Sequence, residues 1–303
     1  MNFAIMLASV VAISPLAANA AGATPTRASG GHENSACELV NSAKATAQTN
    51  IPIRVIDGRV YVQASVNGQG PFTFAVDTGA SGFGRADIKL VSKLHLKFSG
   101  ERSSSDGVST SRAKVVRIET LRLGQHAVHD VSVMARDYSK HMSSSAPFAG
   151  ILGRKFFADG LLIIDYPERR LIFTRSEGLA VTDRDSLPYD RPFRVKVTIG
   201  SVETRGNLDT GANISFVLPQ SLFATVADGH VGKANLGQLT NTTIKTNDAK
   251  LKAPIQIGLA RFSGADVRVS SRFPELLVGA RALQNYTLLI DQRSSRIALC
   301  PPA

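Results

Sequence analysis

The tetrapeptide Asp-Thr-Gly-Ala occurs twice in this sequence, at positions 77–80 and 209–212. From ordinary residue frequencies, one specified tetrapeptide is expected about 0.01 times in a chain of this length, so two copies are a strong signal. If a fold brings Asp77 and Asp209 together, the two carboxyl groups cannot both ionise easily, and they share one proton. An ionised oxygen can then accept a proton from water, while the protonated partner hydrogen-bonds the carbonyl that the water attacks.

The residues after each aspartate suit the support of such a pair. Each aspartate is followed by a threonine, whose hydroxyl could hydrogen-bond across a contact between the two loops. Next comes a glycine, which has no Cβ atom and so allows the backbones to approach closely. The sequence therefore predicts a site with Asp77 and Asp209 as catalytic residues, with the loops supported by Thr78, Gly79, Ala80, Thr210, Gly211 and Ala212.

Both tetrapeptides belong to a longer internal repeat. The alternating segments 60–66 and 193–199 each lead through a turn into the segment that ends at the aspartate, a pattern typical of β-hairpins. Further matches pair 121–124 with 255–258, 151–153 with 277–279, and 161–165 with 288–291. The pattern predicts a duplicated all-β body with about 125 residues per lobe. Short helical segments are expected after each tetrapeptide, around 88–94 and 219–226.

The duplicated loops, each followed by an apolar-apolar-Gly element, resemble those of aspartic proteases, with both lobes in one chain as in pepsin-like enzymes. In detail they are similar to retropepsin loops, which favour Ala after the Gly, and Ile151-Leu152-Gly153-Arg154 resembles the retropepsin element behind the catalytic loop. The resemblance covers residues 52–300 and implies an all-β fold of two homologous acid-protease lobes. These lobes would be related by a pseudo-twofold axis, with the active site in the cleft between them. It also implies an endopeptidase for peptide or protein substrates that needs no cofactor, and a monomer with intramolecular lobe pairing.

Two positions depart from these families. Ala80 and Ala212 stand where pepsin-like enzymes usually carry Ser or Thr. Loss of that hydroxyl donor predicts a raised pKa for the carboxyl pair, and hence a pH optimum less acidic than that of pepsin. Ser81 stands where retropepsins offer an acidic partner to the arginine, so the role of Arg154 stays open.

A mobile hairpin over the cleft, the flap, is expected between the first Asp loop and the next strand of the sheet. Segment 99–112 contains two glycines and many serines, which suits such a hairpin, and it lacks the Tyr of pepsin-like flaps. Gly107 and Val108 are the possible flap residues, because Val108 is the only apolar side chain at the centre of the segment.

The N-terminal segment has the pattern of a secretory signal peptide, with an apolar run that ends in Ala18-Asn19-Ala20. We therefore expect export to the periplasm or the medium, with no stable membrane span after cleavage. The expected divisions are a signal peptide at 1–20, a flexible tail or short pro-segment at 21–50, a first lobe at 51–175, an interlobe linker at 176–190 and a second lobe at 191–303. Cys37 and Cys300 could pair in an oxidising compartment or remain separate thiols.

Composition argues against other classes of function. The 35 Lys and Arg exceed the 24 Asp and Glu, which gives a net charge of +11, but the excess is spread along the chain. Aromatic residues are only 6% and Trp is absent, so few side chains could stack on bases, and no nucleic-acid partner is expected. His126 and His129 could ligate a metal, yet the matching segment of the second half has no His. A solvated turn without metal is favoured there.

Two other readings of the chain stay open. One is a catalytically silent peptide-binding protein with the aspartic protease fold, and the other is a basic surface-binding protein. Asp165 and Asp291 also recur in register, and the charged, turn-like segments that follow them favour a structural role as turn formers.

Overall fold

Strands dominate the computed structural model, which describes residues 35–302 except 106–108, 139–147, 228–229 and 239–240. They form three sheets of eight, nine and six strands, which confirms the predicted all-β fold. The expected signal peptide at 1–20 and the possible flap residues Gly107 and Val108 lie outside the described residues.

The first half of the chain forms the eight-stranded sheet, in the order β2-β3-β4-β9-β5-β8-β7-β6. Its elements are β2 (Arg54–Ile56), β3 (Arg59–Val66), β4 (Gln69–Asp77), β5 (Gly84–Asp87), α2 (Ile88–Lys93), β6 (Phe98–Ser105), β7 (Thr110–Leu123), β8 (His126–Arg136), β9 (Gly150–Gly153) and the 3-10 helix η2 (Arg154–Phe157). Strands β3 and β4 form the predicted hairpin. Strand β4 also runs parallel to β9, which places Asp77 beside Gly153.

The second half forms the nine-stranded sheet, in the order β16-β17-β20-β15-β21-β14-β13-β18-β19. Its elements are β13 (Arg194–Ile199), β14 (Val202–Asp209), β15 (Phe216–Pro219), α3 (Gln220–Val226), β16 (Ala234–Gln238), β17 (Thr243–Lys250), β18 (Ile255–Ile257), β19 (Ala260–Phe262), β20 (Asp266–Ser270), β21 (Leu276–Gly279) and α4 (Ala280–Leu283). Strands β13 and β14 form the second predicted hairpin. Strand β14 runs parallel to β21, which places Asp209 beside Gly279, so the surroundings of the first aspartate are repeated.

The third sheet draws on both halves, in the order β1-β11-β10-β22-β23-β12. Its strands are β1 (Thr49–Pro52), β10 (Leu161–Asp165), β11 (Arg170–Thr174), β12 (Ser186–Pro188), β22 (Thr287–Asp291) and β23 (Arg296–Cys300). At its centre β10 pairs antiparallel with β22, its counterpart in the repeat, with Ile163 opposite Leu289. Because side chains alternate along a strand, Leu162 and Leu288 join the main core, whereas Ile163 and Leu289 pack on the other face.

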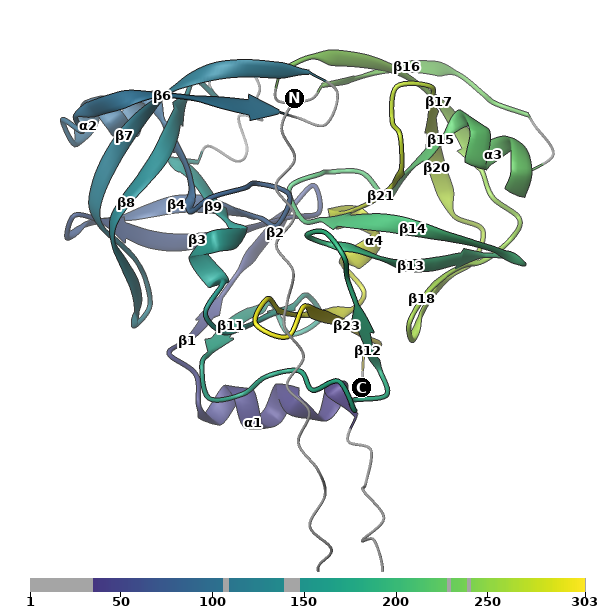
Figure 1. Cartoon of the computed structure of the whole chain (residues 1–303), viewed down its shortest axis with the longest axis horizontal. Helices are drawn as coiled ribbons and strands as arrows, with labels where there is room; N and C mark the ends of the chain where they lie inside the picture. Colours follow the sequence, from purple (N-terminus) through teal and green to yellow (C-terminus); the bar gives the residue numbers. More distant parts are fainter. Residues whose placement is uncertain (1–34, 106–108, 139–147, 228–229, 239–240, 303) are drawn as a thin grey trace, which may run out of the picture. The chain divides into compact units, whose positions relative to one another are not determined.

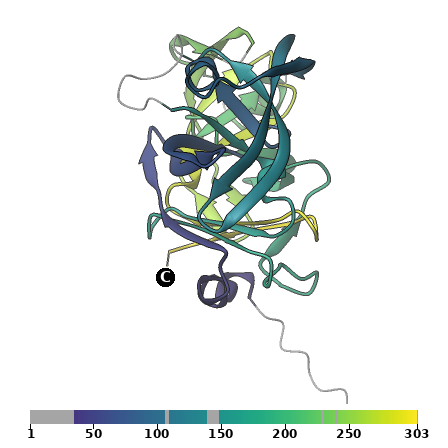
Figure 2. The same cartoon turned by 90° about the vertical axis from the view of Figure 1, so that its left-hand side faces the viewer.

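That other face is covered by the 3-10 helix η1 (Ala36–Glu38) and helix α1 (Leu39–Ala45), drawn along the six-stranded sheet in Figures 1 and 2. In its described part, residues 35–50, the segment expected as a flexible tail or short pro-segment at 21–50 thus contains two short helices that pack on this sheet. Ala36 and Ala43 are fully buried there, and a disulfide joins Cys37 to Cys300 of β23. A seven-residue helix with one fully buried side chain shows too little periodicity to be predicted from sequence.

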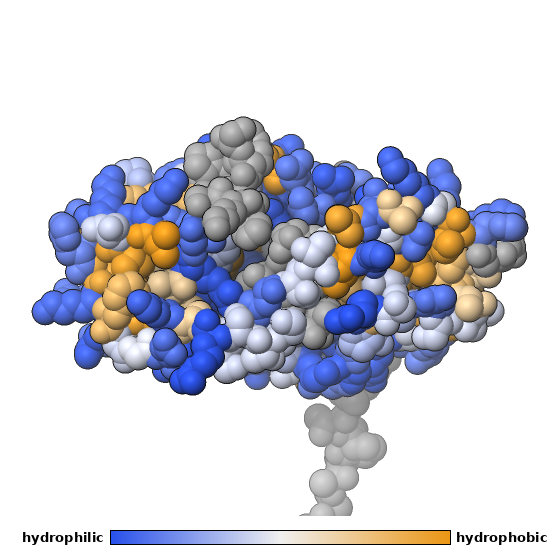
Figure 3. All heavy atoms as spheres, turned by 90° about the horizontal axis from the view of Figure 1, so that it is seen from above, coloured by the Kyte–Doolittle hydropathy of each residue, from blue (hydrophilic) through white to orange (hydrophobic). Residues whose placement is uncertain are grey.

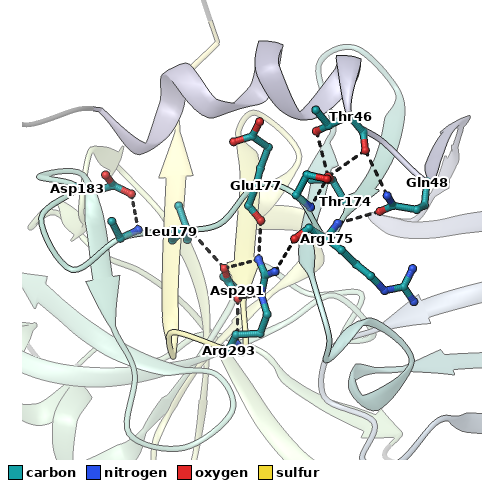
Figure 4. Close-up of polar contacts among 11 residues, drawn as sticks. Thr46, Gln48, Thr174, Arg175, Glu177, Leu179, Asp183, Asp291 and Arg293 are labelled. Atoms are coloured by element: carbon teal, nitrogen blue, oxygen red, sulfur yellow. Dashed lines mark hydrogen bonds and ion pairs between the residues drawn. The ribbon is translucent and has the colours of Figure 1, made fainter.

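Polar contacts from both ends of the chain hold the segment between the two halves (Figure 4). Its start is bound by Gln48, whose side-chain oxygen accepts from the Arg175 amide at 2.8 Å. Asp291 accepts from the Leu179 amide at 3.1 Å and from the Arg293 amide at 2.9 Å. Arg293 in turn donates to the Arg175 carbonyl at 2.9 Å. The interpretation of Asp291 as a structural turn residue is in line with these contacts.

Asp165, the counterpart of Asp291 in the first half, also accepts a backbone amide, that of Glu168, at 3.1 Å. It further accepts from the Thr287 hydroxyl at 3.1 Å, which ties the turn to the second half. Both aspartates therefore hold turns at the ends of the two central strands.

Hydrophilic residues cover much of the face seen in Figure 3, with hydrophobic residues gathered in separate patches on its two sides. Among the described residues, no helix has the length and apolar character needed to cross a membrane.

Candidate active site

The two predicted aspartates lie at the ends of matching strands, Asp77 on β4 and Asp209 on β14. The residues directly before them, Val76 and Leu208, are each only 1% exposed. Asp77 and Asp209 are themselves half-buried, so both stay within reach of solvent. Each sheet therefore places one carboxyl group at the boundary between the buried core and the solvent.

The threonines after the aspartates bind each other's loops reciprocally. The Thr78 amide donates to the Thr210 hydroxyl oxygen at 3.0 Å, and the Thr210 amide donates to the Thr78 hydroxyl oxygen at 3.1 Å. The Thr210 hydroxyl donates in turn to the Val76 carbonyl at 2.9 Å. Thr78 is 3% exposed and Thr210 fully buried, so water does not compete for these bonds. The predicted contact between the two loops is thus present in the structure.

The glycines allow each loop to lie against the opposite carboxyl group. A Cβ atom added to Gly211 would lie 2.3 Å from Cγ of Asp77, and one added to Gly79 would lie 2.6 Å from Oδ2 of Asp209. Both distances are far below van der Waals contact. The structure therefore brings all eight predicted active-site loop residues together.

Each carboxyl group also accepts a hydrogen bond from its own loop. Oδ1 of Asp77 accepts from the Ala80 amide at 2.9 Å, and Oδ1 of Asp209 accepts from the Gly211 amide at 2.8 Å. Burial, followed by repulsion from the Asp77 charge, raises the pKa of Asp209 well above its ordinary value. The Gly211 amide and Arg59 oppose this rise only in part. The pair therefore keeps one proton to a less acidic pH than an isolated carboxyl group would.

Two arginines bind the glycine carbonyls of the loops. Arg154 donates from Nη1 to the Gly79 carbonyl at 3.1 Å, which gives a role to a residue whose function the sequence left open. Arg59, on β3, donates from Nε to the Gly211 carbonyl at 2.6 Å. Sequence reasoning missed Arg59, because its partner lies 152 positions further along the chain and no repeated motif marks it.

Two hairpins extend toward each other at one edge of the fold (Figure 1). Strands β6 and β7 pair at the expected flap position, and β16 and β17 form the second hairpin. Asn241, between β16 and β17, bridges them. Its side-chain oxygen accepts from the Ser111 hydroxyl at 2.8 Å and from Arg136 at 3.0 Å. Its side-chain amide donates to the carbonyls of Ser104 at 2.9 Å and Ser109 at 3.1 Å.

The two histidines considered as metal ligands, His126 and His129, have hydrogen-bond partners other than the catalytic aspartates. His126 is fully buried, so the expectation of a solvated turn is wrong for this residue. Its Nε2 lies 2.7 Å from the Phe156 carbonyl, and Arg175 donates to its Nδ1 at 2.9 Å. His129 is exposed, and its Nδ1 lies 3.2 Å from the Thr120 hydroxyl. No cluster of three potential metal-ligating side chains occurs within the described part of the chain.

Comparison with known proteins gives evidence on the family to which this chain is similar. A family model described as aspartyl protease matches residues 62–156. The matched range contains the first Asp-Thr-Gly-Ala loop and Arg154, and it ends before the second loop. The match supports an aspartyl protease family and a protease-type function for the chain. No curated protein matches the sequence significantly.

Proposed function

We propose that this chain is an exported aspartic endopeptidase, in which a water molecule activated between Asp77 and Asp209 hydrolyses peptide bonds. The observation that carries the proposal is the reciprocal pair of hydrogen bonds between Thr78 and Thr210. These bonds hold the two loops in one fixed relation, and the glycines then place each carboxyl group against the opposite loop. Preorganised groups of this kind are what water activation requires.

The raised pKa of Asp209 keeps one shared proton on the pair, so that one carboxyl group is protonated while the other supplies the ionised oxygen. The ionised carboxylate removes a proton from water, and the water oxygen forms a bond to the carbonyl carbon of the peptide. The protonated carboxyl group donates to the carbonyl oxygen, which becomes a hydroxyl group of the tetrahedral intermediate. The carboxyl group that took the proton from water then gives it to the amine nitrogen as the C–N bond breaks. A hydroxyl group of the intermediate returns its proton to the other carboxylate as the carbonyl reforms, so the pair is again singly protonated.

The substrate-binding arrangement in this proposal is a cleft between two homologous lobes related by a pseudo-twofold axis. Support comes from the repeated surroundings of the aspartates, since β4 beside β9 is matched by β14 beside β21. Antiparallel pairing of β10 with β22 joins equivalent segments of the two halves. Export is supported by the Cys37–Cys300 disulfide, because disulfides persist mainly in oxidising compartments.

Digestion of a peptide library between about pH 3 and pH 8 tests the proposal. The parent protein is expected to cut, with sensitivity to pepstatin, whereas Asp77→Asn and Asp209→Asn lose cleavage by roughly three orders of magnitude or more. Variants that cut as well as the parent would show that the dyad assignment is wrong. A parent that binds peptides without cutting them would support the silent peptide-binding protein, and retention on heparin that moderate salt abolishes would support a basic surface-binding protein.

A further inference from the structure

A pocket of about 180 Å³ lies beside the first active-site loop, between that loop and the β6–β7 hairpin. Ser81 and Arg85 line it on the loop side, and Arg102 and Val115 line it on the hairpin side. Strand β8 closes the remaining wall. The pocket has room for about one side chain, because clefts that hold drug-sized ligands are roughly 300–1,000 Å³.

Arg85 places a buried positive charge in this wall. The residue is only 8% exposed, and its Nη1 donates to the Ser81 carbonyl at 2.7 Å and to the Gly84 carbonyl at 2.9 Å. Burial lowers the pKa of Arg85, and the charge of Asp77 opposes this effect. No carboxylate forms an ion pair with Arg85 within the described part of the chain. The guanidinium is therefore fixed in place by neutral carbonyls, and no ion pair with a described carboxylate occupies it.

Arg102 brings a second charge from the opposite side of the pocket. It pairs in register with Ala113 of β7, so the two side chains lie on the same face of the hairpin as Val115. Within the described residues Arg102 has no ion-pair partner, whereas Arg112 of the same hairpin contacts Glu101 at 3.2 Å. Arg112 alternates with Ala113 along β7 and so points to the other face of the hairpin.

The described residues that line the pocket thus include two arginines and no carboxylate. Arginine binds carboxylates through charge-assisted hydrogen bonds in fixed geometry. We propose that this pocket binds a carboxylate of the peptide substrate, so that the enzyme prefers an acidic group near the bond that it cuts. The inference rests on the proposed function and adds a substrate class to it. The carboxylate belongs either to an Asp or Glu side chain or to the C-terminus of the substrate.

Matched peptides test this preference. A short internally quenched peptide that the library shows to be cut is prepared with Glu, and separately with Gln, at each position around the cleaved bond. We expect one position at which the parent cuts the Glu peptide roughly 10- to 100-fold better in kcat/KM, the effect of one charge-assisted contact. Each peptide is made as the free acid and as the C-terminal amide. A preference that survives amidation identifies a side chain, and one that amidation removes identifies the C-terminus.

Arg102→Glu is the informative variant, because this exposed side chain can be changed without opening the core. We expect it to abolish or reverse the preference for Glu, while the control Arg112→Glu on the same hairpin keeps it. Equal cleavage of Glu and Gln peptides by the parent at every position, with free acids and amides alike, overturns the inference. So does a preference that Arg102→Glu leaves unchanged.

A result in which no peptide is cut speaks against the proposed function and leaves the pocket to be judged by binding. Fluorescence anisotropy then measures the binding of labelled Glu and Gln versions of one library peptide, substituted at each position in turn, to the parent protein and to Arg102→Glu. Tighter binding of the Glu peptide, lost in Arg102→Glu, supports the pocket assignment without any catalysis. Equal affinities for the two peptides on the parent protein refute it.

Discussion

Replacing Gly211 with Ala tests whether the close approach of the two loops is what positions the catalytic pair. The new Cβ atom would lie 2.3 Å from Cγ of Asp77 and 2.5 Å from each of its carboxyl oxygens. Since carbon atoms in van der Waals contact are about 3.5 Å apart, the loop or the carboxyl group must shift by about 1 Å. A displacement of this size can reduce a rate about 100-fold, which corresponds to about 2.7 kcal/mol in the activation barrier.

The assay is kcat/KM on one peptide selected from the library, measured beside circular dichroism and thermal unfolding. The matched control is Gly237→Ala, because the nearest atom to its new Cβ would be Cγ1 of Ile244 at 3.4 Å, an ordinary contact. We expect the control to keep the parent's activity within about three-fold. Gly79→Ala is the counterpart on the other loop, since its Cβ would lie 2.6 Å from Oδ2 of Asp209.

Two results would refute this reasoning. One is a folded Gly211→Ala protein with the kcat/KM of Gly237→Ala, which would show that the loops tolerate a wider separation. The other is a loss of activity in Gly211→Ala that comes only from a higher KM at unchanged kcat, because a misplaced Asp77 must slow the chemical step. Should Gly211→Ala fail to fold, Gly79→Ala carries the same test.

Further outcomes are expected at four other residues. Thr210→Val should lower the free energy of unfolding, measured in urea, by about 2–4 kcal/mol, because it leaves the buried Thr78 amide without its partner. Thr210→Ser keeps the hydroxyl group and should lower the free energy of unfolding by about 1 kcal/mol. Equal effects of the two variants would contradict this. The raised pKa of Asp209 should keep the singly protonated pair to less acidic pH, so that kcat/KM peaks well above pH 2 and falls as pH rises through that pKa; a peak near pH 2 would contradict this. Burial lowers the pKa of His126 in the folded state, so the unfolded chain takes up the proton first as pH falls below about 6.5. The free energy of unfolding should therefore fall by up to about 1.4 kcal/mol per pH unit in that range. Urea unfolding at several pH values should show a flatter slope for His126→Gln. Asn241→Ala removes the bridge between the two hairpins and should speed amide hydrogen exchange in β7 near its start, with melting temperature nearly unchanged; unaltered exchange would speak against the bridge.

The duplicated loops could be predicted because each of their sequence features occurs twice in the chain. Two copies of Asp-Thr-Gly-Ala at matching places in two alternating hairpins give both the strand ends and the pairing of the loops. Helices α2 (Ile88–Lys93) and α3 (Gln220–Val226) were predicted near their observed bounds for the same reason. The glycines then follow from the packing of one loop on the other, since only a residue without Cβ fits against the opposite carboxyl group.

Residues that have no counterpart in the other half, and whose partners lie far away in the sequence, gave no such repeated signal. Arg59 binds a carbonyl 152 positions away, and Asn241 bridges to a hairpin about 130 positions earlier in the chain. His126 was predicted to lie in a solvated turn because it belongs to a strand-to-turn segment whose counterpart has no His, yet tertiary packing against Phe156 and Phe173 buries it. Helix α1 is short, and the two cysteines alone did not establish the disulfide that joins the preceding 3-10 helix to β23.

The two halves share a backbone arrangement, but they contribute different side chains to the support of the active-site loops. Both arginines that bind the loop carbonyls come from the first half, since Arg59 holds Gly211 and Arg154 holds Gly79. In the second half, Ala280 stands where Arg154 stands in the first. The second half contributes in return through Gln292, whose side-chain amide donates to the Arg154 carbonyl at 2.7 Å. A pair of second halves would therefore lack both carbonyl-binding arginines, and a pair of first halves would lack Gln292. The threonine contact and the glycine approach are thus symmetric, whereas the side chains that bind the loop carbonyls and Arg154 come from two different halves in one chain.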